Sequence, residues 1–121
     1  MINSRAVVMA TVVGTVLQLA MVLAGHSNAS IAAMFAVGGM GISLVAGVMY
    51  AKFAGPASTG SHAIGGLVAG GACALIGICV SYLLGDVTAL ILAAGTLSSA
   101  VTGAIGGWVG HLVFGSARVT A

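Results

Sequence analysis

The chain has 121 residues, of which 60% are hydrophobic and 3% are charged. A water-soluble domain carries about 25% charged residues, so this composition excludes a soluble globular protein. The formal net charge of +2 is too small and too scattered for a nucleic-acid partner or for a basic patch that binds anionic lipid.

Four long apolar segments predict an all-α integral membrane protein with a bundle of four transmembrane helices. The spans cover residues 6–25, 31–51, 63–84 and 89–114, and they form a single membrane domain over residues 1–121. Each span is close to the ~20 residues that a helix needs to cross about 30 Å of hydrocarbon. A transmembrane barrel would instead show short segments of alternating polar and apolar residues, and this chain has none.

The first span, residues 6–25, contains Gln18, the only carboxamide inside a span. An unpaired amide in hydrocarbon is costly, so we expect Gln18 to face another helix. We interpret Gln18 as a structural hydrogen-bonding residue rather than as a transport site. The apolar stretch is longer than the ~7–15 residues of a signal-peptide core, which favours an uncleaved first helix.

The second span ends in a loop that contains the only proline, Pro56, beside Gly55. Because proline cannot continue a helix interior, this pair predicts the end of the second helix. We expect Ser61 to cap the third helix, with His62 as its first residue. A very short turn around Asp86 joins the third span to the fourth.

Small residues recur every four positions along three of the spans. This spacing places small side chains on one helix face and lets two helices approach closely in lipid. We therefore predict that the last three spans pack backbone to backbone, and that the surplus of small faces contacts a further subunit. The predicted packing residues are Gly39, Ser43 and Gly47 in the second span, Gly65, Ala69, Cys73, Gly77 and Ser81 in the third, and Ala94, Ser98, Thr102, Gly106 and Gly110 in the fourth.

A second set of small residues lies beside the first in the fourth span, at Gly95, Ser99, Gly103 and Gly107. The sequence AIGG also occurs twice, at residues 63–66 and 104–107. Both copies lie at the same predicted membrane boundary, which is consistent with two backbones that approach closely there. The large aliphatic residues on the opposing faces suit contact with membrane lipid.

The charged residues predict the orientation of the chain. Arg5, Lys52 and Arg118 fall on one side of a four-span arrangement, and Asp86 falls on the other. By the positive-inside rule, both termini and the loop after the second span face the cytoplasm. The short loops and compact length favour the inner membrane of a bacterium.

The spans contain no Asp, Glu, Lys or Arg, the residues on which ion-coupled transport and proton relays usually depend. The sequence also lacks a hydrolase triad, a metal-ligand cluster and a phosphate-binding loop. We therefore expect a protein that is not an enzyme and that holds no metal ion.

Two histidines, His62 and His111, are predicted to lie at the same membrane boundary and within reach of each other. Such a pair can ligate a haem, and a single histidine can bind the magnesium of a bacteriochlorophyll. The short stretch from Gly107 to His111 resembles light-harvesting polypeptides, which implies a bacteriochlorophyll at His111. The favoured alternative gives Trp108, His111 and Tyr50 a structural contact or a place in a belt of ring side chains at the membrane interface, and proton or ion handling is a further alternative.

These observations support three hypotheses for function, in order of preference. The first is a non-enzymatic accessory or structural subunit that packs through its Gly, Ala and Ser faces against itself or a larger membrane complex. The second is a homo-oligomeric small channel or transporter, because hydroxyl-lined helices can conduct neutral solutes. The third is a haem- or bacteriochlorophyll-binding membrane subunit that uses His111. The residues expected to line a channel are Gln18, Ser43, Ser98, Ser99 and Thr102.

Overall fold

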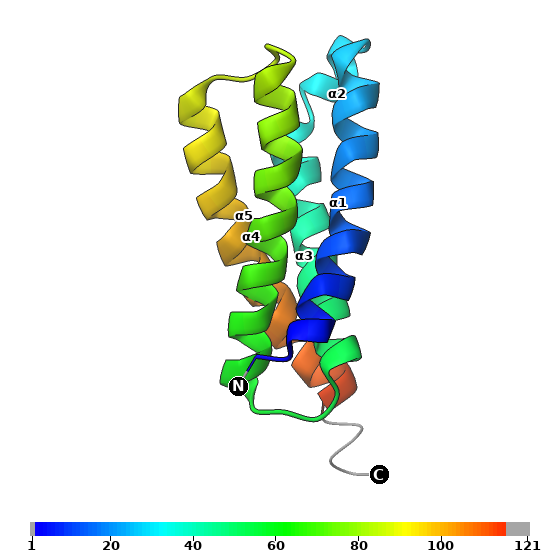
Figure 1. Ribbon diagram of the computed structural model, residues 1–121, viewed down its shortest axis with the longest axis vertical. Coiled ribbons are helices and arrows are strands. Elements are labelled where there is room, and N and C mark those ends of the chain that lie inside the picture. The colour runs from blue at the N-terminus through cyan, green and yellow to red at the C-terminus, as the bar shows by residue number, and fades with distance from the viewer. Residues whose placement is uncertain (1, 116–121) are drawn as a thin grey trace.

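The computed structural model describes residues 2–115, which form four long helices in up-and-down order (Figure 1). The long helices are α1 (Ser4–His26), α3 (Phe35–Ala54), α4 (Thr59–Leu83) and α5 (Ala89–Gly110). A single turn, α2 (Ala29–Ala32), precedes α3, and a π-helical turn, η1 (His111–Gly115), follows α5. This range contains no strand, so the predicted all-α fold with four long helices is confirmed.

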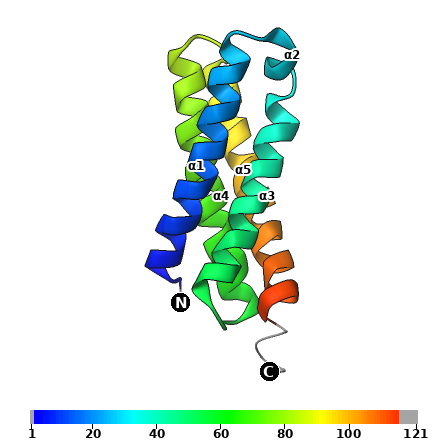
Figure 2. The ribbon, with the colours of Figure 1, turned by 90° about the vertical axis from the view of Figure 1, so that its right-hand side faces the viewer.

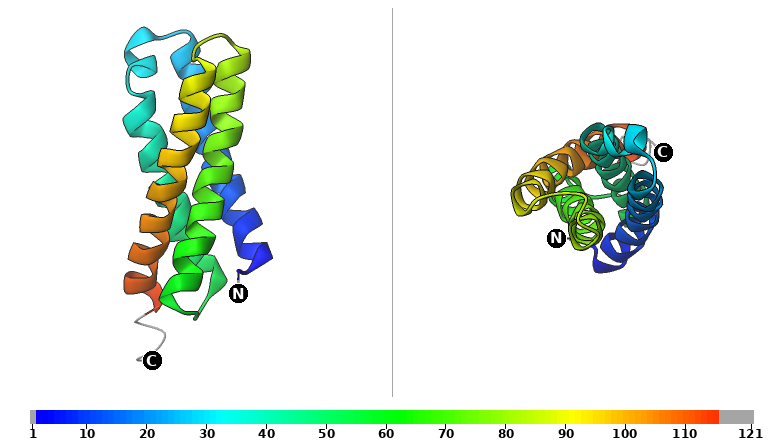
Figure 3. Two further views of the ribbon diagram at one scale, coloured as in Figure 1. Left: turned by 90° about the vertical axis from the view of Figure 1, so that its left-hand side faces the viewer. Right: turned by 90° about the horizontal axis from the view of Figure 1, so that it is seen from above.

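The helices α3 and α4 adjoin at the centre of the bundle. α1 packs against both of them on one side and α5 on the other, as Figures 2 and 3 show from the sides and from above. Both ends of the described chain lie at the same end of the bundle as Lys52, which we call the Lys52 end. The opposite end, where α4 turns into α5, is the Asp86 end.

Two helix starts differ from the sequence-based prediction. The second span does not begin as one helix at residue 31, because α2 is interrupted at Ala33 and Met34 before α3 begins. The third helix begins earlier than predicted, and its cap is Ser58, whose side chain accepts a hydrogen bond from the backbone N–H of Ser61. The predicted cap at Ser61 is therefore wrong, because an earlier hydroxyl in the same loop takes that role.

The interior of the bundle is built from small side chains, and its exterior from large aliphatic ones. Buried positions include Ala6, Ala10, Ala46, Ala51, Ala69 and Ala74, whereas Val16, Val37, Leu83, Leu90 and Leu97 are exposed. A soluble protein shows the reverse distribution, since water drives large apolar side chains inward. Four helices in the described range are also long and apolar enough to cross a membrane. Together these features indicate a multi-pass membrane protein.

Candidate functional site

A layer of glycines brings α4 and α5 into backbone contact over half of the bundle. A Cβ added to Gly66 would clash with the carbonyl oxygen of Gly103, and one added to Gly70 would lie 2.7 Å from the Cα of Gly103. A Cβ added to Gly107 would clash with the carbonyl oxygen of His62. Gly66 and Gly107 belong to the two copies of AIGG, so the close approach expected from that repeat is confirmed.

The same layer joins α3 to α5. A Cβ on Gly47 would clash with the Gly103 carbonyl oxygen and lie 2.8 Å from the backbone nitrogen of Gly107. A Cβ on Gly106 would clash with the carbonyl oxygen of Leu44, and one on Gly110 would lie 2.7 Å from the Cβ of Ala51. We call Gly47, Gly66, Gly70, Gly103 and Gly107 the glycine layer.

The small residues predicted for the second and third spans are all buried. In α3 they are Gly39, Ser43 and Gly47, and in α4 they are Gly65, Ala69, Cys73, Gly77 and Ser81. Three residues of the α4 set contact α1 or α3: Gly65 lies against the Tyr50 ring of α3, and Gly77 and Cys73 lie against Gln18 and Gly14 of α1. The backbone contact with α5 includes Gly66 and Gly70, which the four-residue pattern starting at Gly65 does not contain.

Within the chain, only the second half of the set predicted for the fourth span is buried. Ala94 and Ser98 are exposed and Thr102 is half-buried, while Gly106 and Gly110 are buried as expected. The reason is that the neighbouring set, which contains Ser99, Gly103 and Gly107, faces the other helices. Toward the Asp86 end, Ala94 and Ser98 border an open cleft between α3 and α5 rather than a helix contact.

At the Lys52 end, His62 and His111 form a hydrogen-bonded pair, which confirms that they come within reach of each other. The two Nδ1 atoms are 2.8 Å apart, and His62 Nε2 lies 2.8 Å from the carbonyl oxygen of Gly55. His62 is completely buried. Because the carbonyl oxygen can only accept, His62 carries its proton on Nε2 and, in the neutral pair, accepts at Nδ1 from the Nδ1–H of His111.

Tyr50, on α3, packs against the His62 ring of the histidine pair. Its ring meets that of His62 edge to face, with centroids 6.3 Å apart and an interplanar angle of 78°. Its hydroxyl accepts a hydrogen bond of 2.9 Å from the backbone N–H of Asn3. Tyr50 is 1% exposed, so its assignment to an interfacial belt is wrong: it packs inside the bundle. Trp108, at 49% exposed, does lie on the outside.

The pair geometry bears on the haem hypothesis. Two axial histidines hold a haem between their rings, whereas His62 and His111 contact each other directly through Nδ1. This arrangement does not accommodate a haem between them, so a cofactor would have to use His111 alone. Within residues 2–115 no group of three or more His, Cys, Asp or Glu side chains could hold a metal ion.

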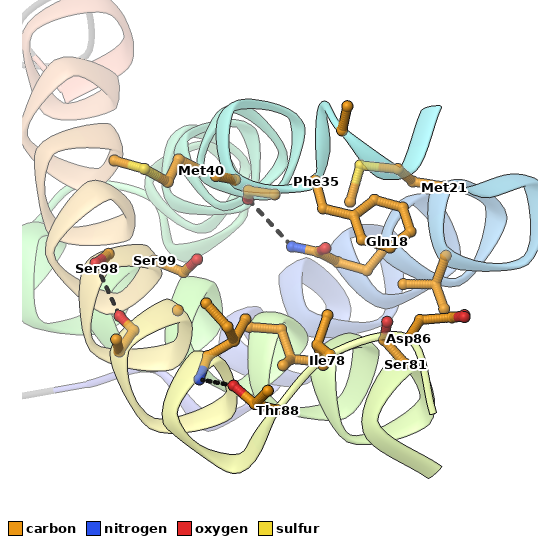
Figure 4. Close-up of a pocket in the computed structure, with 18 residues that line it drawn as sticks. Gln18, Met21, Phe35, Met40, Ile78, Ser81, Asp86, Thr88, Ser98 and Ser99 are labelled. Carbon is orange, nitrogen blue, oxygen red and sulfur yellow. Dashed lines mark hydrogen bonds between the residues drawn. The ribbon is translucent and has the colours of Figure 1, made fainter. Parts of the chain in front are cut away.

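Near the Asp86 end, a cleft of about 530 Å³ opens between α3 and α5 (Figure 4). Its wall is mainly apolar and is formed by all four long helices together with the turn between α4 and α5. Gln18, Ser98 and Ser99 line it, whereas Ser43 and Thr102 do not. The Ser43 hydroxyl instead donates to the carbonyl of Gly70 at 3.2 Å. The structure thus gathers three of the five residues expected to line a channel.

Three buried polar side chains lie in the wall of this cleft: Gln18, Ser81 and Ser99, the last of which is 3% exposed. Gln18, which is 1% exposed, donates from Nε2 to the carbonyl oxygen of Gly39 at 3.2 Å, so its predicted contact with another helix is confirmed. Ser81 is 2% exposed, and its hydroxyl has no hydrogen-bond partner among the described residues. In the turn after α4, Asp86 also lines the cleft, and its Oδ2 lies 2.8 Å from His26 Nδ1.

Comparison of the chain with family models, with curated proteins and with solved structures found no match. We therefore infer function from the glycine layer, the histidine pair and the cleft.

Proposed function

We propose that this chain is a small accessory subunit of a membrane complex, without enzymatic activity, that associates through the outer face of α5. The partner is a second copy or a larger membrane protein. The observation that supports this most directly is that α5 is covered least by its own chain. In the most apolar 18 residues of the span Ala89–Phe114, 17% of the residues are buried inside the chain, whereas the corresponding share in α4 is 44%. α5 touches α3 and α4 and leaves its remaining side facing outward (Figure 3).

The outer face of α5 suits a helix partner. Ala93, Leu97, Val101 and Trp108 are exposed along it. In lipid, one helix gains stability from another through close contact and dispersion, since the lipid tails are as apolar as the side chains. Ala93 permits such close contact, and Leu97, Val101 and Trp108 supply dispersion contacts.

The glycine layer supports a structural role over conduction through a single chain. The lining of the cleft extends to Ser99, and one turn later Gly103 meets the backbones of Gly47 and Gly66. A solute that entered the cleft would have to separate these backbones to continue. The channel hypothesis therefore needs a path between chains or a large movement of α5.

We also propose a location and an orientation for the subunit. Arg5 lies in the first turn of α1 and Lys52 in the last turn of α3, so both cations lie at the Lys52 end. Arg118 lies outside the described residues. Asp86 lies at the other end. We propose that the protein lies in the inner membrane of a bacterium. By the positive-inside rule, the Lys52 end and both termini then face the cytoplasm.

A photo-crosslinking experiment in native membranes tests the proposed role. A benzophenone amino acid is placed at Leu97, on the outer face of α5, and in a matched variant at Val16, which is similarly exposed on α1. We expect a protein adduct from position 97 and lipid adducts alone from position 16. Lipid adducts alone from both positions, with a monomer after mild extraction, would rule out the accessory-subunit proposal.

The competing channel hypothesis has its own measurement. Liposomes that contain this protein alone are mixed with excess glycerol, and their reswelling is followed by light scattering. We expect the same rate as in empty liposomes. A rate that rises with the amount of protein would favour the channel.

A further inference from the structure

We propose that the cleft between α3 and α5 is a binding site for a neutral, largely apolar molecule that carries one hydrogen-bonding group, such as an alcohol with an aliphatic chain. This site goes beyond the subunit role, which involves the outer face of α5. The ligand would lie against the inner face of α5, between α5 and α3, and its polar group would meet Ser81.

The size and lining of the cleft fit such a ligand. Its volume of about 530 Å³ falls within the ~300–1,000 Å³ typical of small-molecule sites. Met21, Phe35, Met40, Ile78 and Ile91 supply much of its apolar wall, and they come from α1, α3, α4 and α5 (Figure 4). Methionine side chains adapt to irregular ligands because they are unbranched and polarizable.

Ser81 marks the place of the polar group. Serine and threonine hydroxyls in membrane helices commonly donate to a carbonyl of the preceding turn, as those of Ser98 and Thr96 do in α5. The hydroxyl of Ser81 does not, although the side chain is 2% exposed and lines the cleft. A buried hydroxyl without a partner is unfavourable, and a ligand oxygen or N–H in the cleft would supply that partner.

The charges around the cleft favour a neutral ligand. Asp86 is the one acid among the lining residues of the described chain, and it lies at the exposed Asp86 end, where its Oδ2 is within hydrogen-bond distance of His26 Nδ1, at 2.8 Å. The other buried polar groups in the wall besides Ser81 are the Gln18 amide and the Ser99 hydroxyl. Neither group can balance a charge on a ligand, and an uncompensated charge in this apolar wall would be strongly disfavoured.

The cleft is open toward the lipid. Ala36 and Met40 on α3 and Ala94 and Ser98 on α5 line it and are exposed, so they form its two lips. The lips belong to spans that are apolar enough to cross a membrane. A lipid-soluble molecule can therefore enter sideways from the bilayer without crossing the glycine layer.

The test uses the whole chain as a monomer in phosphatidylcholine nanodiscs. The probe is a dodecanol derivative with a diazirine and a terminal alkyne, and labelled residues are located by mass spectrometry. We expect labels on the lips and wall of the cleft, and their loss when unlabelled dodecanol is added. The subunit proposal is not involved, since no partner protein is present.

Two pairs of variants locate the site. Ser81→Ala should lower labelling about three- to tenfold, the effect of losing one hydrogen bond. Thr15→Val is its control, because Thr15 carries another buried hydroxyl without a partner but does not line the cleft. Ala94→Phe should fill the cleft and abolish labelling, whereas Ala93→Phe, one position away and outside the cleft, should not.

Two further probes decide the class of ligand. A matching hydrocarbon without the hydroxyl should label the cleft weakly. Equal labelling by this hydrocarbon, with no effect of Ser81→Ala, would overturn the assignment of a polar anchor. Equal labelling by a photoreactive phosphatidylcholine would also overturn the proposal, because ordinary bilayer lipid would then fill the cleft.

Discussion

The Nδ1 atoms of His62 and His111 lie 2.8 Å apart although 49 positions separate the residues in the chain. The glycine layer brings them together. His62 lies one turn before Gly66 on α4, and His111, the first residue of η1, follows Gly107 of α5 by four positions. Because residues four apart share a helix face, antiparallel contact at the two glycines places the two histidines opposite each other at the next turn.

The first prediction concerns the protons of this pair. The carbonyl of Gly55 fixes the proton of His62 on Nε2, so the neutral pair needs His111 to carry its proton on Nδ1. Solid-state ¹⁵N NMR of histidine-labelled protein in lipid should therefore show different tautomers for His62 and His111, once the signal of the third histidine, His26, is assigned by its loss in His26→Gln. Replacing His62 with glutamine should free His111 to take its ordinary mixture of tautomers. Two identical Nε2–H tautomers in the unmodified chain would contradict the geometry.

The second prediction concerns the glycine layer. A Cβ on Gly103 would clash with the carbonyl oxygen of Gly66 and lie 2.9 Å from the Cα of Gly70. Both are backbone atoms, which cannot move away by rotation of a side chain, so Gly103→Ala must push α4 and α5 apart. We expect a loss of about 1–3 kcal/mol in the free energy of unfolding, measured by titration with sodium dodecyl sulfate in mixed micelles.

The control for Gly103→Ala is Gly41→Ala. Gly41 is an exposed glycine of α3 whose added Cβ would meet nothing within 4 Å. Alanine is the better helix former, so this change should stabilise the protein by about 0.5–1 kcal/mol. Equal effects of the two substitutions would show that the close approach of α4 and α5 contributes little to stability.

The sequence alone could predict the helices because length and hydropathy determine them locally. It also indicated that Gln18 meets another helix and that the AIGG copies approach each other, since a buried amide needs a partner and paired glycines allow close contact. It could not decide which of two neighbouring sets on α5 faces inward. Ala94 and Ser98 are as small as Gly95 and Ser99, and the choice depends on how α5 tilts against α3 and α4.

The cleft could not be predicted for the same reason. Its residues come from every long helix, and it exists because α5 meets α3 at Gly106 and Gly110 but not at Ala94 and Ser98. The sequence indicates only that Ser81 is the last of a set of small residues in the third span, which predicts helix packing and not a cleft. Only the structure shows that its hydroxyl is buried without a partner among the described residues.

The third prediction concerns Tyr50, whose hydroxyl accepts a hydrogen bond from the Asn3 backbone just before α1 begins. Tyr50→Phe keeps the ring against His62 and removes this bond, so we expect a loss of about 1 kcal/mol and faster hydrogen exchange in the first turn of α1. Tyr82→Phe is the control, because Tyr82 is 44% exposed at the other end of the bundle. A larger effect at Tyr82 would contradict the structure.

The fourth prediction compares one substitution at two buried serines. Ser43 donates to the carbonyl of Gly70, whereas the hydroxyl of Ser81 has no partner among residues 2–115. Removing a hydroxyl that is paired costs a hydrogen bond, and removing one that is buried unpaired relieves a penalty. In protein freed of bound lipophilic molecules, Ser43→Ala should lose about 1 kcal/mol and Ser81→Ala should gain a similar amount.

The same measurement, repeated with dodecanol, separates a binding role of Ser81 from a purely structural one. At a given concentration, a ligand that binds the folded state stabilises it more when it binds more tightly. The unmodified chain and Ser43→Ala should therefore gain stability as dodecanol is added, while Ser81→Ala should gain less. If Ser81→Ala is destabilised without ligand, its hydroxyl has a partner in the membrane that these contacts do not show, and the argument for a polar anchor in the cleft fails.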